Sequence, residues 1–69
     1  MNKTLDNNIA KFRSKQKISQ QDLADAIGVS RKTISTVETS RFTPSVVIAL
    51  SIAQYFETSV ESLFYFEDE

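Results

Sequence analysis

The 69-residue chain contains no cysteine, no histidine and no tryptophan, and it has a single glycine and a single proline. The absence of cysteine and histidine excludes disulfide frameworks, zinc sites, cysteine nucleophiles and histidine bases together. No other grouping of a base, a nucleophile and metal ligands stands out. We therefore expect a protein that is not an enzyme and that holds neither a cofactor nor a metal ion.

Long apolar runs are also missing. The polar start, MNKTLDNNIAKF, shows no signal peptide, and no stretch is long enough to span a membrane. Linkers, repeats and low-complexity segments are absent as well, so residues 1–69 are expected to form one domain. These absences predict a cytoplasmic protein without a membrane partner.

Positive charge is missing from the last part of the chain. The net charge is −1, but all eight cations lie at or before Arg41. Residues 1–41 carry a net charge of +4, whereas residues 42–69 carry five acids and no cation, a charge of −5. A basic half can face a phosphate backbone while an acidic half points away from it. This asymmetry favours a nucleic acid as the partner.

One well-marked stretch, SQQDLADAIGVSRKTISTVE, spans residues 19–38. Ser19 can cap a helix, and Asp22 occupies the capping-box position three residues later. Gly28 suits the left-handed residue that ends a helix, and Ser30 can cap a second one. Apolar residues recur at helical spacing in both halves. Two short helices joined by a tight turn with glycine form a helix-turn-helix.

The second of these helices begins with Arg31-Lys32-Thr33. A helix N-terminus favours anions, so a purely structural helix would more often have Asp or Glu there. Arg, Lys, Ser and Thr instead suit a helix that meets phosphates and base edges. A solvated helix start that is basic by chance is the alternative interpretation.

The segment before residue 19 is predicted to form a first helix. Leu5, Ile9 and Phe12 have the spacing of an apolar stripe on a helix from about Asp6 to Gln16. The other positions, and the turn that follows, carry the cations Lys11, Arg13, Lys15 and Lys17. Such a cationic run is either a solvated face or a phosphate-binding one.

Two more helices are predicted after the only proline, Pro44. Ser45 can cap a helix that runs to about Phe56, and Ser59 can cap a fifth helix. The helix after Ser45 is apolar almost all round. The stripe expected to enter the core is Val46, Ala49, Leu50, Ala53 and Phe56. The stripe expected to meet the fifth helix or another subunit is Ile48, Ile52 and Tyr55.

The order and spacing of short motifs resemble those of compact phage-repressor-like (Cro/XRE-type) helix-turn-helix regulators. The motifs lie between Ile9 and Phe64: Ile9-x-x-Phe12-Arg13, Ile18-Ser19-Gln20-x-x-Leu23-Ala24, Ile27-Gly28-Val29-Ser30, Thr33-Ile34-Ser35-x-Val37-Glu38, Pro44-Ser45, Ala49-Leu50-x-Ile52-Ala53 and Val60-Glu61-x-Leu63-Phe64. The resemblance implies an all-α, lambda-repressor-like five-helix bundle with a central helix-turn-helix. It also implies a transcriptional regulator, a repressor, that binds a palindromic operator in the major groove of double-stranded DNA as a homodimer.

The resemblance further implies roles for individual residues. Ser19–Ile27 corresponds to the positioning helix and Arg31–Glu38 to the recognition helix. The expected base contacts are Arg31, Lys32, Thr33 and Thr36. The expected phosphate contacts are Lys17, Gln20, Ser30, Thr39, Ser40 and Arg41. Arg13 and Glu38 resemble a pair that joins the first and third helices; the alternative is an exposed pair that contributes little.

The chain departs from the family after the glutamate, where Asn-Gly is common and this chain has Thr39-Ser40. Glycine adopts a left-handed backbone freely, whereas serine does so only with strain. We therefore expect the loop and its backbone contacts to phosphate to differ, with the side chains of Thr39, Ser40 and Arg41 able to donate instead.

The end of the chain has more apolar surface than one small core can bury. Phe64, Tyr65 and Phe66 are consecutive, and left in water they would form a patch that invites association. Together with Tyr55, they are the expected homodimer interface, in a region of about residues 55–66. The alternative is that the chain end folds back as a strand beside residues 2–5 and covers them.

A second class of function uses the same surfaces. The domain could serve as an antitoxin or as another protein-interaction module, and the sequence leaves this alternative open. The sequence of so small a chain indicates no pocket for an effector, so any regulatory signal is expected to arrive through a partner protein.

Overall fold

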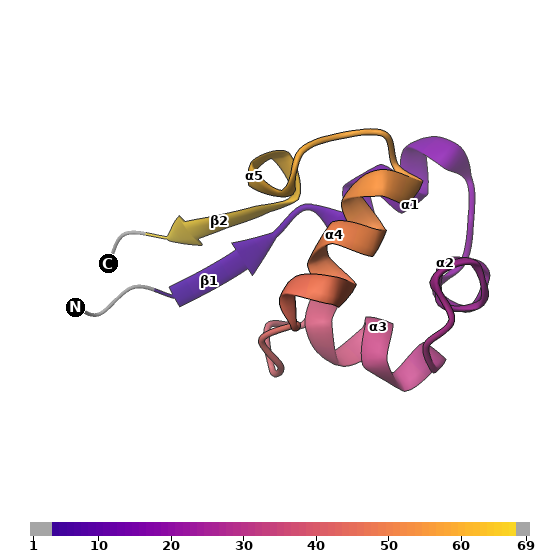
Figure 1. Cartoon of the computed structure of the whole chain (residues 1–69), viewed down its shortest axis with the longest axis horizontal. Helices are drawn as coiled ribbons and strands as arrows, with labels where there is room; N and C mark the ends of the chain where they lie inside the picture. Colours follow the sequence, from indigo (N-terminus) through magenta and orange to yellow (C-terminus); the bar gives the residue numbers. More distant parts are fainter. Residues whose placement is uncertain (1–3, 68–69) are drawn as a thin grey trace.

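The computed structural model describes residues 4–67, which form five helices and a two-stranded sheet (Figure 1). In chain order the elements are β1 (Thr4–Asn7), α1 (Ile9–Gln16), α2 (Gln20–Ile27), α3 (Arg31–Glu38), α4 (Val46–Tyr55), α5 (Val60–Leu63) and β2 (Phe64–Glu67). The two strands project from one side of the helical part. None of the helices within residues 4–67 has the length and apolar character needed to cross a membrane.

Serine caps set the start of four helices. At α2 the capping box is complete: the Asp22 N–H donates to Ser19 Oγ, and the Ser19 N–H donates to Asp22 Oδ2, both at 3.0 Å. These bonds with Ser19 lower the pKa of the Asp22 carboxyl. Gly28 ends α2 in the left-handed conformation, with φ of 76°. The other three caps accept backbone N–H groups in the same way: Ser30, Ser45 and Ser59. All these predicted caps are confirmed.

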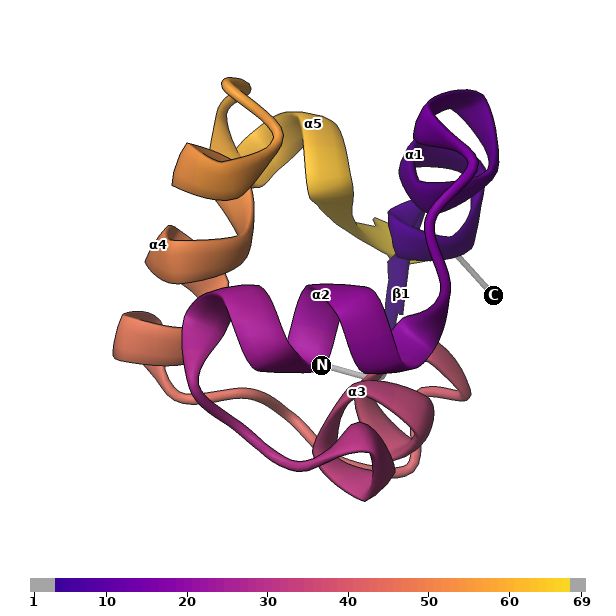
Figure 2. The ribbon, with the colours of Figure 1, turned by 90° about the vertical axis from the view of Figure 1, so that its right-hand side faces the viewer.

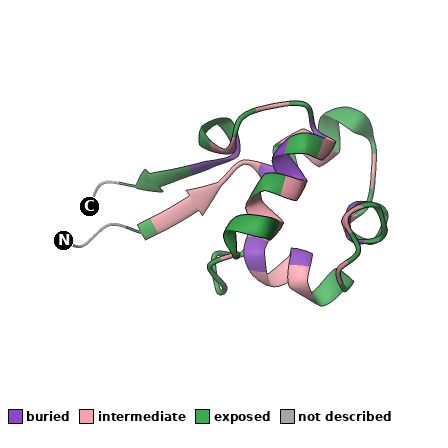
Figure 3. Cartoon of the chain, viewed as in Figure 1, coloured by how far each residue is buried: buried purple, intermediate pink, exposed green. Residues whose placement is uncertain are grey.

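The core draws on every helix and on β2. Figure 3 shows the buried residues on the sides of the helices that face one another. Two of the buried side chains, Ile34 and Val37, fix the inner side of α3. The full buried set is Ile9, Leu23, Ala24, Ile34, Val37, Ile52, Ala53, Phe56, Leu63 and Phe64.

The orientation of α4 differs from the predicted one. Ile52, Ala53 and Phe56 are buried, whereas Val46 and Leu50, which were expected in the core, are exposed. The predicted core stripe is therefore right at Ala53 and Phe56 and wrong at Val46 and Leu50, and Ile52, predicted for the other stripe, is buried instead. The reason is that α4 is apolar almost all round, so periodicity alone cannot show which side meets the core.

The first helix begins later than predicted. Asp6 lies in β1, and α1 starts only at Ile9, so the expected helix start at Asp6 is wrong. The Asn7 side chain accepts the Ile9 N–H at 3.2 Å, and the Asn8 N–H donates to the Leu63 carbonyl at 2.7 Å. The preceding residues pair with β2, a long-range interaction that the apolar spacing does not report.

The chain end folds back as a strand, as the alternative predicted, but this covers only Phe64, while Tyr65 and Phe66 remain exposed. β1 and β2 are antiparallel, with Leu5 opposite Phe66 and Asn7 opposite Phe64. The strand was expected beside residues 2–5; the paired residues are 4–7, and residues 2 and 3 lie outside the described part. The last two residues of the expected acidic end, Asp68 and Glu69, lie outside it too.

Candidate nucleic-acid interface

The turn between α2 and α3 has the form that the sequence predicts. Figure 2 shows α2 lying across α3, with the connecting segment at one end of both helices. The Val29 N–H donates to the Ala24 carbonyl at 3.0 Å, so the turn closes the end of α2. With Ile34 and Val37 buried, the opposite side of α3 faces away from the protein.

The first turn of α3 presents two cations on its outer side. Arg31 and Lys32 are exposed, and within residues 4–67 neither forms an ion pair or a hydrogen bond through its side chain. Both side chains are therefore available to a ligand. They have the donor groups that bind guanine edges or phosphates.

The threonines of α3 are more engaged than its cations. Thr33 Oγ1 lies 2.9 Å from Ser30 Oγ, and Thr36 Oγ1 donates to the Lys32 carbonyl at 2.9 Å. Both threonines are half-buried. Thr36 therefore offers a base its methyl group and lone pairs rather than a free hydroxyl donor, whereas in the contact between Thr33 and Ser30 either hydroxyl can be the donor.

Ser35 shares the outer side of α3 but was not among the predicted site residues. It follows Arg31 by four positions and Lys32 by three, the spacing of neighbours on a helix surface. Helical periodicity could have identified it from the sequence.

An ion pair holds α3 against α1 and α2. Arg13 Nε donates to Glu38 Oε2 at 2.7 Å and Arg13 Nη2 donates to Glu38 Oε1 at 3.1 Å. Gln20 Nε2 also donates to Glu38 Oε1, at 3.2 Å, and Arg13 Nη1 donates to the Ile18 carbonyl at 3.0 Å. The hydrogen bond to Glu38 raises the pKa of Arg13. The Arg13 and Glu38 side chains are only 18% and 8% exposed, so the exposed-pair alternative does not apply.

Asn7 contacts the same C-terminal end of α3, a role that was not predicted. Its Nδ2 donates to the carbonyls of Val37 at 3.0 Å and Glu38 at 3.3 Å, which are among the last carbonyls of the helix. The same side chain accepts the Ile9 N–H. Asn7 thus joins the sheet, α1 and α3. A single asparagine before a helix carries no sequence signal for so distant a contact.

The loop after α3 uses its backbone donors within the protein. The Ser40 N–H donates to the Val37 carbonyl at 3.1 Å, and the N–H groups of Arg41 and Phe42 donate to the Thr36 carbonyl at 3.0 and 3.2 Å. These three N–H groups therefore already have acceptors.

The hydroxyls of this loop are also directed into the protein. Thr39 Oγ1 donates to the Ser35 carbonyl at 3.0 Å, and Ser40 Oγ lies 3.4 Å from Asp6 Oδ1. Of the loop residues predicted to meet phosphate, Arg41 has its side chain fully available.

Ser40 adopts the left-handed conformation that glycine favours, with φ of 61°. Ser40→Gly should relieve this strain and raise the free energy of unfolding by about 1 kcal/mol. For a domain of this size the melting temperature should rise by roughly 4–8 °C. Thermal unfolding followed by circular dichroism measures the change, and Ser14→Gly, inside α1, is the control that should lower it. An unchanged or lower melting temperature for Ser40→Gly would show that the backbone is unstrained there.

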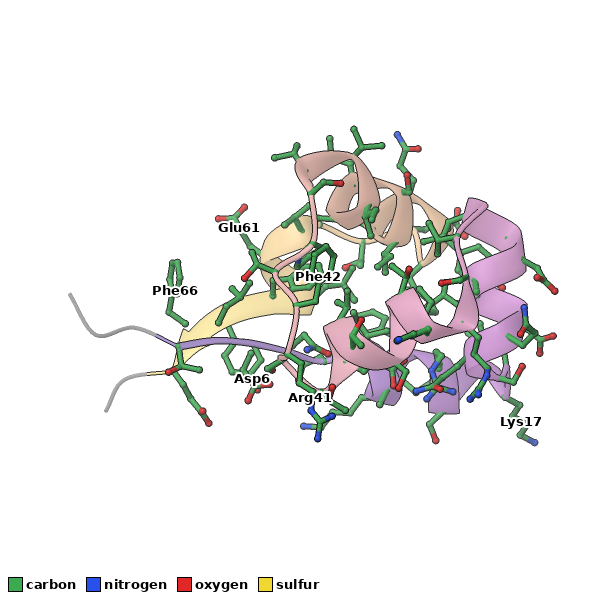
Figure 4. All side chains as sticks on the ribbon, turned by 90° about the horizontal axis from the view of Figure 1, so that it is seen from below. Asp6, Lys17, Arg41, Phe42, Glu61 and Phe66 are labelled. Carbon is green, nitrogen blue, oxygen red and sulfur yellow. The ribbon has the colours of Figure 1, made fainter. Side chains whose placement is uncertain are left out.

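Two further cations flank the outer side of α3. Figure 4, in which α3 lies toward the viewer, shows Arg41 and Lys17 projecting on the same side of the molecule, beyond opposite ends of that helix. Both side chains are exposed. Glu61 of α5 lies on the opposite side in this view. The cations that flank α3 and this acid of α5 therefore lie on different sides of the protomer.

The aromatic residues predicted for a dimer interface do not share one surface. Phe64 is buried in the protomer core and Tyr55 is half-buried against it. Tyr65 lies opposite Asp6 in the sheet, and partial desolvation together with that carboxylate raises the pKa of Tyr65. Phe66 is 61% exposed. Phe64 therefore serves the protomer core, and the surface it was expected to offer a partner is lost.

Comparison with known proteins finds relatives that span almost the whole chain. Residues 9–63 match the helix-turn-helix family. An uncharacterized HTH-type transcriptional regulator of Methanocaldococcus jannaschii is 36% identical over 63 residues, covering 91% of this chain and 96% of that protein. A similarly described protein of Archaeoglobus fulgidus is 41% identical, and the match covers 88% of this chain and 87% of that protein. Another, of Bacillus subtilis, is 32% identical, and the match covers 91% of this chain and 96% of that protein.

A solved structure shares the fold. It is described as "a putative DNA-binding protein from Bacteroides fragilis" and aligns with a TM-score of 0.78 over 88% of this chain and 98% of its own. The two sequences are 21% identical. The arrangement of helices is therefore common to proteins whose sequences have diverged widely.

Proposed function

This chain belongs to the Cro/XRE-type helix-turn-helix family of transcriptional regulators, and on that premise we propose that it is a cytoplasmic, non-enzymatic repressor that binds a palindromic operator as a homodimer. The observation that carries the proposal is the division of α3 into two sides. Its inner side is fixed by Ile34 and Val37, and its outer side presents Arg31 and Lys32 without partners among the described residues.

In the proposed complex the first turn of α3 enters the major groove, as recognition helices do. Arg31 and Lys32 bind base edges, and Thr33 and Thr36 contribute shape and methyl contacts. Ser35, on the same outer side, joins them. The residues proposed to contact phosphate are Lys17, Gln20, Ser30, Thr39, Ser40 and Arg41. Among the last set, the exposed cations require no rearrangement, whereas the hydroxyls of Thr39 and Ser40 must turn away from their present acceptors.

Loss of Arg31 or Lys32 should relax sequence preference. A good contact to guanine discriminates against the wrong base by roughly 1–3 kcal/mol, so Arg31→Ala and Lys32→Ala should each lose preference at one position of each half-site. Selection of bound sequences from random duplex DNA measures this directly.

Lys17→Ala and Arg41→Ala are the matched controls, because they remove an exposed cation proposed to meet phosphate. They should weaken all sequences about equally and leave the selected motif intact. If Arg31→Ala and Lys32→Ala both select the wild-type motif, the assignment of α3 to base recognition is wrong.

A further inference from the structure

We propose that two copies of this chain associate through the exposed side of α4 together with Phe42 and Phe66. The α4 side consists of Val46, Val47 and Leu50, which are 74%, 73% and 50% exposed. Phe42 is 48% exposed and Phe66 is 61% exposed. We call these five residues the α4 patch. Isolated exposed apolar residues are common, but a group of large ones on one side of a small protein marks an interaction site.

The five side chains lie on one side of the molecule. Val46, Val47 and Leu50 are neighbours by helical spacing, and the exposed side of α4 faces the viewer in Figure 3. In Figure 4, Phe42 lies beside the start of α4, and the Phe66 ring points from the sheet toward the side on which α4 lies. The patch therefore extends from α4 to the end of the sheet.

The apolar character of the α4 patch favours a second copy of this chain as its partner. Residues 42–56 contain no charged side chain, so the part of this surface that they form offers no charged group to a phosphate or to a charged peptide. A second copy presents the same uncharged apolar side chains, and a two-fold interface is self-complementary in this way. Glu61 lies at the edge of this side of the molecule (Figure 4), where a polar rim is usual.

The position of the patch also fits a pair of recognition helices, a step that rests on the proposed function. In Figure 4 the outer side of α3 faces the viewer, whereas α4 forms the upper side of the molecule. A two-fold axis along the viewing direction, beside α4, would leave both α3 helices facing the viewer. A patch on the side opposite α3 would instead turn the two helices away from each other.

The dimensions agree with this arrangement. The Cα framework is 20 Å deep along its shortest axis, which is the direction from α4 to the far side of the molecule (Figure 1). Along this direction, two copies in contact through the patch hold their α3 helices within about twice that depth. This range includes the roughly 34 Å between successive major-groove sites on one face of B-DNA. A stable interface buries about 800 Å² per partner, about one sixth of the 4771 Å² that the protomer exposes.

The test is sedimentation of the full chain at concentrations from below one micromolar to hundreds of micromolar. The wild type should form a dimer, and Val47→Glu should raise its dissociation constant by about 100-fold or more, because two carboxylates are brought together in an apolar interface. The exposure of Val47 makes this substitution compatible with the fold, which circular dichroism verifies. Val46→Glu provides a second variant. Ala10→Glu, an exposed position on α1, is the matched control and should sediment as the wild type does.

Binding to DNA separates this inference from the proposed function. Val47→Glu should lose the gain in affinity that a palindrome gives over a single half-site, and it should keep the wild-type affinity for the half-site. A wild type that dimerises through the patch but binds no DNA would support the inference and contradict the proposed function. A monomeric wild type would overturn the inference, and so would a dimer that survives both Val47→Glu and Val46→Glu. Binding of a different protein, rather than a second copy, to the α4 patch would overturn it as well.

Discussion

Raising the salt concentration from 50 to 200 mM should weaken the binding of this protein to its operator by about 10³-fold. Each neutralised phosphate contributes about 0.9 to the slope of log affinity against log salt. The proposal assigns the cations Lys17 and Arg41 to phosphate, and with one further cation from α1 this gives three contacts on each protomer and six in a dimer. The slope should therefore be about −5 or steeper.

Single substitutions should show how much each cation contributes to the slope of log affinity against log salt. Lys17→Gln and Arg41→Gln should each reduce its magnitude by about 2 in the dimer, because each removes two phosphate contacts. Glu57→Gln, which changes an exposed acid after α4, should leave it unchanged. Titration by fluorescence anisotropy at several salt concentrations provides the measurement. An affinity for DNA that does not change with salt concentration would show that these basic residues do not contact phosphate.

The predictions that proved right rest on local chemistry. The serine caps and the left-handed Gly28 depend on residues within a few positions of each other, so the sequence contains all the information needed. The predicted start of the first helix failed because a distant segment decides it. Thr4–Asn7 forms a strand only because Phe64–Glu67 returns to pair with it.

The side of α4 that meets the core could not be predicted for a different reason. Ile48 and Ile52, on the buried side, are as apolar as Val46 and Leu50, on the exposed one. The hydrophobic effect is non-directional and favours burial of either side. The packing of α2 and α5 against α4 makes the choice, and no single segment of the sequence contains that packing.

The candidate site was predicted in part by resemblance rather than by physics. Charge and helix position pointed to Arg31 and Lys32, but the link between Arg13 and Glu38 came only from the family pattern. The role of Asn7 was predicted neither from charge and helix position nor from the family pattern, because its contact with Val37 spans 30 positions of the chain. Contacts that hold a recognition helix in place are long-range by nature and leave little trace in local sequence.

Removal of the Arg13 side-chain charge should be the most destabilising of the substitutions considered. Arg13→Met leaves the Glu38 carboxylate, which is 8% exposed, with Gln20 as its remaining side-chain donor. Breaking a buried pair in this way costs about 3 kcal/mol, since the remaining charge is poorly solvated. The Ile18 carbonyl loses a donor as well. Urea unfolding should show this loss as a lower midpoint with an unchanged slope. Lys11→Met, an exposed position on the same helix, should change stability by less than about 0.5 kcal/mol.

The double variant Arg13→Met/Glu38→Gln separates the ion pair from simple packing. Glutamine at position 38 keeps the size of the side chain and removes the charge left without its partner. If the stranded charge causes the loss, the double variant should recover about 1–2 kcal/mol relative to Arg13→Met alone, and the cycle should show a coupling energy of that size. A double variant as unstable as the sum of the two single ones would assign the loss to packing of the arginine stem. Hydrogen exchange completes the test, because the α3 amides should lose protection in Arg13→Met and regain it in the double variant.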